Sequence, residues 1–211
     1  MPNGNTSEPV SGGEYIEGGE LQENNNMAAI TVTKDVAELR TLFNKVGRIY
    51  FTSSNDKTPA TLSTLDFRLP ILEDSVEFDT GEPDVETVNL TTGEKWTTMT
   101  TAGEPNITMQ CASFDPSITD LFLNAVSGAT NQTFQIGANT YTGKGYDLSA
   151  KKVTGGIVML GEDLQMAIFM PNVEIYSSIG IEQNVPGYFT MNITPLANTA
   201  GVAIYFMPKA S

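Results

Sequence analysis

Nine carboxylates and a single basic residue lie between Leu69 and Glu104 of this 211-residue chain. The acids are Glu73, Asp74, Glu77, Asp79, Glu82, Asp84, Glu86, Glu94 and Glu104, and the base is Lys95. Carboxylates at this density could ligate a divalent cation, or supply the paired acid and base of a glycosidase. They also repel polyanions, because binding of phosphate requires Lys and Arg. The bland alternative is a solubilising acidic edge that prevents strand-to-strand aggregation.

The spacing of these acids gives little support to a metal site or an enzyme. Glu82, Asp84 and Glu86 share a face if their strand begins that early, but the segment lacks the glycine and the terminal bidentate glutamate of a calcium loop. No two acids stand out as a catalytic pair. The chain contains no histidine, which excludes His-based triads and His-ligated zinc. We therefore expect no enzyme, no metal site and no cofactor.

Cys111 is the only cysteine, so an intrachain disulfide framework is impossible. It shares one face of an alternating run with Ile107 and Met109, and this pattern predicts a small buried hydrophobic side chain rather than a nucleophile.

The negative charge is concentrated in two places. The net charge is -14 and the sequence pI is about 4.2, and nearly all of the excess lies in the acidic segment and in residues 1–27. This balance argues against DNA binding through a basic face and against attraction to an anionic membrane. Neither a secretory signal nor an apolar run long enough to cross a membrane is expected.

Composition divides the chain into an arm and one domain. Residues 1–27 contain five Glu, no base and few apolar side chains, which predicts a flexible acidic N-terminal arm. Tyr15, Ile16 and Leu21 are candidates for anchoring this arm to a neighbouring subunit. Residues 28–211 are rich in Thr, Asn and Gly and are predicted to form a single β domain.

Two helices and a long hairpin are expected within this domain. Thr33 is placed to cap a short helix over about 34–44, and Asp115-Pro116 opens a central helix that continues through Ala125 to Gly128. Strands 85–90 and 94–101 flank the turn Thr91-Thr92-Gly93 and form the hairpin. Further strands are predicted over 48–52, 72–78, 105–113, 156–160, 164–170, 173–181, 188–194 and 202–207.

Several of these features follow one another in a characteristic order. A Gly-Arg-Ile-Tyr-Phe strand (47–51) precedes the acidic hairpin, and Ser113-Phe114-Asp115-Pro116 leads into the apolar helix. A β-rich half follows, with a Met-Pro-Asn-Val-Glu turn at 170–174. Over residues 47–207 this pattern of elements resembles the major tail tube proteins of long-tailed, siphovirus-like bacteriophages.

The resemblance implies a β-sandwich or β-barrel with one packed central helix, a short N-terminal helix and a long extended hairpin. It further implies hexameric rings that stack into a hollow tail tube. The partners would be other copies of the chain and the tape measure, terminator and baseplate proteins, with DNA passing through without specific binding and no membrane involved. Such a protein resides in the virion tail, and in the host cytoplasm during assembly.

Within a tube, Glu82, Asp84 and Glu86 are the candidates for lining the lumen, because strand alternation directs Val85 to the other side. Trp96, the lone tryptophan, is predicted to be either a core residue or an interface anchor.

Two other classes of protein remain compatible with the sequence. A monomeric β-sandwich that binds carbohydrate or a host surface would gather exposed aromatics such as Tyr141 and Tyr146 in one groove. A hydrolase would need a cleft and two carboxylates with separated pKa values.

Deletion of residues 1–27 tests the predicted role of the arm. We expect the truncated protein to polymerise less than the full chain, because the apolar groups around Tyr15 to Leu21 would no longer reach a neighbouring subunit. Light scattering and negative-stain images of the two proteins at equal concentration measure this. Unchanged polymerisation would rule out an anchoring role.

Overall fold

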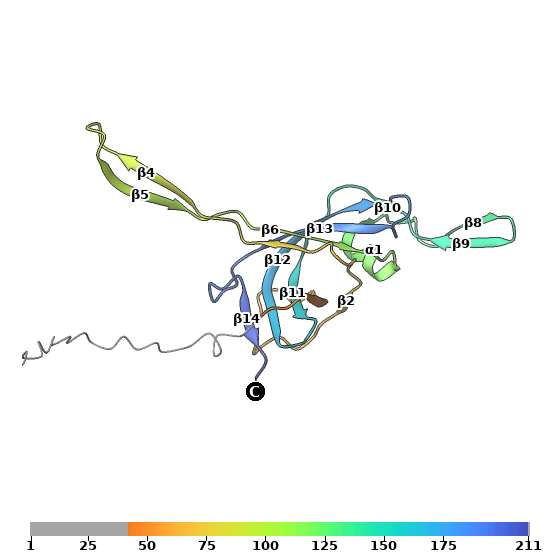
Figure 1. Cartoon of the computed structure of the whole chain (residues 1–211). Helices are drawn as coiled ribbons and strands as arrows, with labels where there is room; N and C mark the ends of the chain where they lie inside the picture. Colours follow the sequence, from red (N-terminus) through yellow and green to blue (C-terminus); the bar gives the residue numbers. More distant parts are fainter. Residues whose placement is uncertain (1–41, 211) are drawn as a thin grey trace, which may run out of the picture. The chain divides into compact units, whose positions relative to one another are not determined.

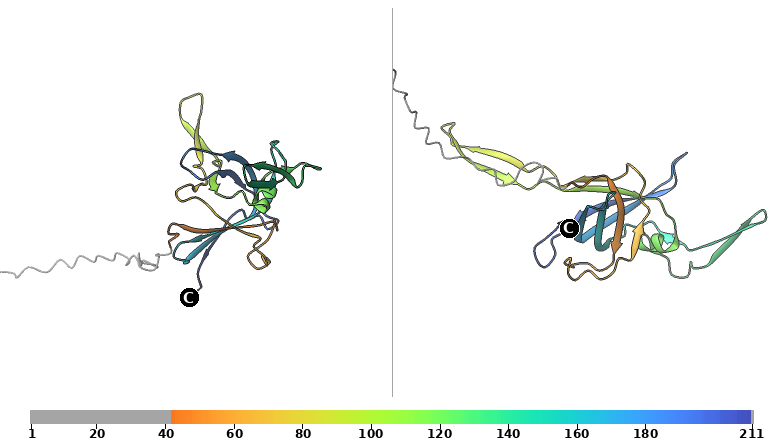
Figure 2. Two further views of the ribbon diagram at one scale, coloured as in Figure 1. Left: turned by 90° about the vertical axis from the view of Figure 1, so that its right-hand side faces the viewer. Right: turned by 60° about the horizontal axis from the view of Figure 1, so that its bottom comes forward.

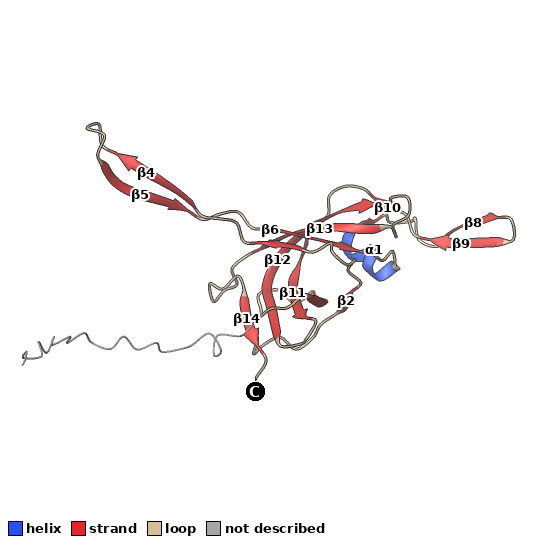
Figure 3. Cartoon of the chain, in the orientation of Figure 1, coloured by secondary structure: helices blue, strands red, loops and turns tan. Residues whose placement is uncertain are grey.

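The structure, a computed structural model, describes residues 42–210 and is mainly β with one helix (Figures 1 and 3). Its elements are β1 (Val46–Thr52), β2 (Phe67–Leu69), β3 (Glu77–Asp79), β4 (Asp84–Asn89), β5 (Lys95–Thr101), β6 (Asn106–Cys111), α1 (Pro116–Phe122), β7 (Asn124–Ala125), β8 (Gln132–Ile136), β9 (Asn139–Gly143), β10 (Tyr146–Asp147), β11 (Val153–Gly161), β12 (Met166–Gly180), β13 (Tyr188–Pro195) and β14 (Tyr205–Pro208). The prediction of a mainly β chain with a central helix is confirmed.

One antiparallel sheet of eight strands organises the domain. Its order is β2-β1-β11-β12-β13-β6-β3, with β14 paired to β12. The first part of β12 pairs with β14 at Met166 to Phe169, whereas the second part pairs with β13 from Val173 to Gly180. In the described part of the chain the sheet ends at β2 and β3, two different strands, and does not close into a barrel.

A single hydrophobic core is built from strands that lie far apart in the sheet. Phe189 and Met191 of β13 pair with Cys111 and Met109 of β6, and all four side chains are completely buried. Phe51 of β1 belongs to the same core. Since β1 and β6 are separated by three strands, the sheet must bend around this core to bring their inner faces together. Figure 2 shows the bending from two further sides.

Helix α1 begins as predicted. The Asp115 carboxylate accepts a hydrogen bond from the Ser117 backbone N–H (2.9 Å), and Pro116 occupies the first turn. This is an N-cap of the usual kind, because the first helical N–H groups have no partner within the helix. Ile118 and Phe122 are buried, and the Phe122 ring lies 5.2 Å from the ring of Phe189.

The predicted end of this helix was wrong. The helix stops at Phe122, not near Gly128, because Leu123 adopts an extended conformation and Ala125 pairs with Tyr146 of β10. Lys151 donates to the carbonyls of Asp120 (2.5 Å) and Leu123 (3.0 Å), which satisfies acceptors that a longer helix would have used internally.

The turn predicted at 170–174 was also wrong, since one strand of 15 residues runs through it. Pro171 has no N–H to donate, and it lies where the register between β11 and β12 shifts, between the pairs Gly155–Val173 and Ile157–Met170. A bulge leaves a residue out of the ladder, so proline is tolerated there. One of the features behind the resemblance is therefore a bulge within a strand.

Several other predictions have clear outcomes. The strands predicted at 48–52, 105–113 and 188–194 are confirmed as β1, β6 and β13, and the 85–101 hairpin as β4–β5. Of the strand predicted at 72–78, only Glu77 and Phe78 are paired, and the last strand begins at Tyr205, later than predicted. The helix predicted over 34–44 lies outside the described residues except for 42–44, which are not helical.

Replacement of Phe189 by Ala tests the shared core. We expect a loss of about 3–5 kcal/mol in the free energy of unfolding, because the ring is completely buried between Phe114 and Phe122. Phe206→Ala is the matched control: its side chain is 57% exposed, and we expect a much smaller loss. Denaturant unfolding of both variants measures the difference, and equal losses would contradict the assignment of the core.

Candidate functional site

The acidic hairpin β4–β5 stands apart from the sheet. Its strands pair only with each other and lie away from the eight-stranded sheet (Figure 1). Neither strand contributes a side chain to the core that residues 42–210 form. Every residue of the two strands is exposed except Val88, which is half-buried. An isolated two-stranded hairpin is at best marginally stable in water, so this element is expected to need contacts beyond those between its own two strands.

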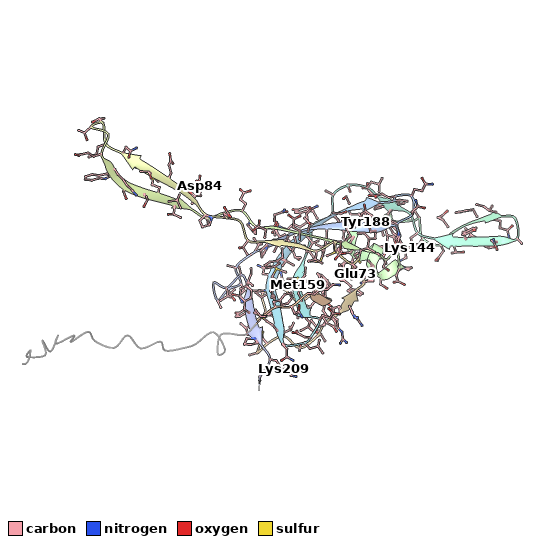
Figure 4. All side chains as sticks on the ribbon, in the orientation of Figure 1. Glu73, Asp84, Lys144, Met159, Tyr188 and Lys209 are labelled. Atoms are coloured by element: carbon pink, nitrogen blue, oxygen red, sulfur yellow. The ribbon has the colours of Figure 1, made fainter. Side chains whose placement is uncertain are left out.

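The lumen candidates lie at the base and on one face of this hairpin. Asp84, labelled in Figure 4, opposes Thr101, and Glu86 opposes Met99. Because Asp84 and Glu86 are two residues apart on one strand, their carboxylates share a face. Val85 points to the opposite face and is 58% exposed. Glu82 is exposed but precedes the first residue of β4, so strand alternation applies only to the other two acids.

Two glycines form the root of the hairpin. Gly81 has φ +78°, and a Cβ at Gly103 would lie 2.4 Å from the Glu82 carbonyl oxygen. No side chain fits at that separation. The two backbone segments can therefore approach closely at the point where the hairpin leaves the sheet.

Trp96 lies on the hairpin near its tip, where the register shifts between Val88 and Asn89. Its side chain is 69% exposed, which is incompatible with the core role and leaves the interface role as a prediction. Tyr15, Ile16 and Leu21 lie outside the described residues.

A second isolated hairpin, β8–β9, was not predicted. It pairs Gln132–Ile136 with Asn139–Gly143 around the loop Gly137-Ala138, in which Gly137 has φ +61°. Phe134 and Tyr141 oppose each other with their rings stacked 5.3 Å apart, yet both are largely exposed. The sequence signals that could have revealed this hairpin are the alternation in Thr-Phe-Gln-Ile and the glycine that follows it.

Polar contacts fasten the base of this second hairpin to α1. Asp120 on the helix accepts hydrogen bonds from Lys144 (2.6 Å) and from the Tyr146 hydroxyl (2.8 Å). The hydrogen bond from Lys144, and to a smaller extent the one from Tyr146, holds the pKa of Asp120 below its ordinary value. The same contact with Asp120 raises the pKa of Lys144. We call this set of contacts the Asp120 clasp.

One pocket of about 560 Å³ lies beside β1 and β2. Its charged lining residues are Lys45, Arg48, Arg68, Glu73, Asp74 and Glu162. Lys45 and Glu73 form an ion pair (2.5 Å), and the remaining lining charges are of both signs. Neither Tyr141 nor Tyr146 lines this pocket, and the Tyr146 hydroxyl is already bound to Asp120.

Other chemical possibilities are limited in the part of the chain that the structure describes. Cys111 is buried as predicted, and burial raises the pKa of its thiol to about 11, so the thiolate is scarce at neutral pH. Between residues 42 and 210, no three His, Cys, Asp or Glu side chains converge into a metal-binding group. No helix in this range has the length and hydropathy needed to cross a membrane.

Comparison with known proteins adds no assignment: no protein-family model matches this chain, and no curated protein matches it significantly.

Replacement of Asp120 by Asn tests the clasp. At neutral pH we expect faster hydrogen exchange of the β8–β9 amides, because the carboxylate that accepts from Lys144 and Tyr146 is lost. The folded pKa of Asp120 is lowered, so the clasp contributes fully above the ordinary Asp pKa of about 3.9 and is lost as the pH falls through the folded value. The difference between the two proteins should therefore vanish at acidic pH.

The control for this prediction is Asp84→Asn, which removes an exposed carboxylate from the other hairpin and should leave β8–β9 unaffected. A difference between Asp120→Asn and the parent protein that persists unchanged at low pH would contradict the proposed role of the carboxylate.

Proposed function

We propose that this protein is a structural virion subunit that assembles into stacked hexameric rings, forming a phage tail tube with a negatively charged lumen for genome delivery. The observation that carries the proposal is the acidic hairpin. It bears Asp84 and Glu86 on one face and exposes apolar side chains, yet it contributes no side chain to the core. We expect such a subunit to be a β-sandwich. A bent sheet around one core is compatible with this fold.

The exposed apolar residues of the hairpin support self-assembly. Val85, Leu90, Trp96 and Met99 are each at least 40% exposed. The register places Met99 opposite Glu86, on the acidic face, and Val85 on the other face, so apolar groups are exposed on both sides of the hairpin. Exposed apolar side chains on an element without a core favour contact with another molecule. In a ring the next subunit would supply that contact and stabilise the marginal hairpin.

The carboxylates support a conduit for nucleic acid. A ring of subunits that brings many Asp and Glu side chains together increases the electrostatic repulsion between the subunits. Such an arrangement needs a compensating function, and prevention of tight contact with phosphate is one. Because polyanion binding depends on neutralisation by cations, a lumen lined by Glu82, Asp84 and Glu86 would let DNA pass without sticking.

Negative-stain imaging of the purified full chain tests the assembly. Rings with six-fold symmetry, alone or stacked into tubes, are expected as the concentration rises. A chain that remains monomeric at every concentration would contradict the proposal.

The variant Glu82→Lys, Asp84→Lys, Glu86→Lys tests the lumen. Rings should still form, but assembled tubes should now retain duplex DNA at low ionic strength and release it as salt is added, because the lysines bind phosphate electrostatically. Filter retention of labelled DNA measures this. The matched control Glu94→Lys, Glu104→Lys, Glu162→Lys changes the charge equally at three other exposed carboxylates. Equal retention by both variants, or none by the first, would contradict the placement of these acids in the lumen.

A monomeric β-sandwich binding module is the second candidate. The stacked and exposed Phe134–Tyr141 pair favours it, since aromatic faces are suited to stacking on sugar rings. A monomer that binds glycans through this pair would replace the tube proposal.

A further inference from the structure

The β8–β9 hairpin has two chemically different faces. The register places Phe134 and Tyr141 opposite each other, and Ile136 follows two residues along the same strand, so the three share one face. They are 60%, 46% and 63% exposed, respectively. We call them the β8–β9 apolar face; the opposite face is polar and consists of Thr133, Gln135, Thr140 and Thr142.

The polar face satisfies its own hydrogen bonds, whereas nothing in residues 42–210 covers the apolar face. Thr133 and Thr142 lie 3.3 Å apart through their hydroxyl oxygens, and the Gln135 side chain donates to Thr140 (3.2 Å). Across the described residues, none of the three apolar side chains is part of the core. Together they expose on the order of 300 Å² of apolar surface, a size at which patches on monomers are often functional.

Charge indicates what covers this face. The segment 121–143 contains no Asp, Glu, Lys or Arg, although the whole chain carries a net charge of -14. The charged residues that bracket it, Asp120 and Lys144, pair with each other at 2.6 Å. Two copies of so acidic a chain repel, and like charges brought together across an interface oppose association. The uncharged β8–β9 hairpin lets copies meet without facing carboxylates, whereas the β4–β5 hairpin carries carboxylates into any contact that its apolar side chains make.

We propose that the β8–β9 apolar face is a docking surface for a second copy of this chain. The inference deepens the proposed self-assembly by naming an element that forms a subunit contact. The Asp120 clasp connects the base of the β8–β9 hairpin to α1. A standard interface buries about 800 Å² on each partner. The part of that area that the β8–β9 apolar face does not supply would come from the surface around it.

The test compares two single substitutions on neighbouring residues of the full chain. Phe134→Glu and Gln135→Glu add the same charge to the same strand, but on opposite faces. Phe134→Glu should raise the concentration needed for self-association at least about tenfold, whereas Gln135→Glu should change it little. Sedimentation velocity over a concentration series measures the association. Thermal unfolding of both variants should match that of the parent protein, because the hairpin adds nothing to the core.

Each outcome decides the proposal. Unchanged association of Phe134→Glu, or equal weakening by both variants, overturns it. Binding of the parent protein but not Phe134→Glu to phosphatidylcholine vesicles, without any change in self-association, overturns it by assigning the face to a membrane. Association that depends on Phe134 but produces no rings or tubes supports this inference and contradicts the tube proposal. Tubes that form equally well with Phe134→Glu support the tube proposal and contradict this inference.

Discussion

One bent sheet has to supply both walls of the hydrophobic core. Strand β12 makes this possible, because β11 pairs with both of its parts on one edge, while on the other edge its first part pairs with β14 and its second part with β13. The change occurs around Pro171, at a bulge where a ladder N–H is not required. Phe51 of β1 and Met109 of β6 lie in the same core. The positions of α1 and of both hairpins depend on the platform that results.

The two hairpins that leave this platform differ in the charge they carry. β4–β5 bears Asp84 and Glu86 on one face, whereas β8–β9 lies within a segment without charged residues. Both expose apolar side chains that a monomer leaves in water. This division of charge is compatible with assembly of an acidic chain, because the uncharged β8–β9 hairpin can hold subunits together while carboxylates stay in solvent. The β8–β9 surface thus fits contact alone, whereas β4–β5 combines exposed apolar side chains with carboxylates that repel.

Alternation of apolar and polar residues made much of the sheet predictable. Phe189, Met191 and Ile193 were assigned to one face of a strand and are buried there. The errors arose where tertiary contacts override local signals. Proline normally ends a strand, and nothing local reveals that Pro171 occupies a bulge created by pairing with β11. The end of α1 depends on Lys151, which is remote in sequence from the carbonyls it satisfies.

The candidate surfaces were predictable to a different degree. The acidic hairpin was visible from its charge and from the turn at Gly93, which has φ +85°. The β8–β9 hairpin was missed because its strands are short and mostly Thr, Asn and Gln, a composition equally typical of loops. Its exposed aromatics carry no charge and no catalytic chemistry, so their residue types alone do not indicate a functional surface.

The symmetry of an assembly limits how these surfaces can be used. A ring requires heterologous contacts, in which one patch on each subunit meets a different patch on the next. The β8–β9 apolar face therefore cannot pair with itself within a six-membered ring, since a face that meets its own copy generates a two-fold dimer. If the chain forms rings, the face must meet another part of the neighbouring subunit. Self-pairing of the face would instead yield closed dimers, and the size of the smallest assembly thus separates these two arrangements.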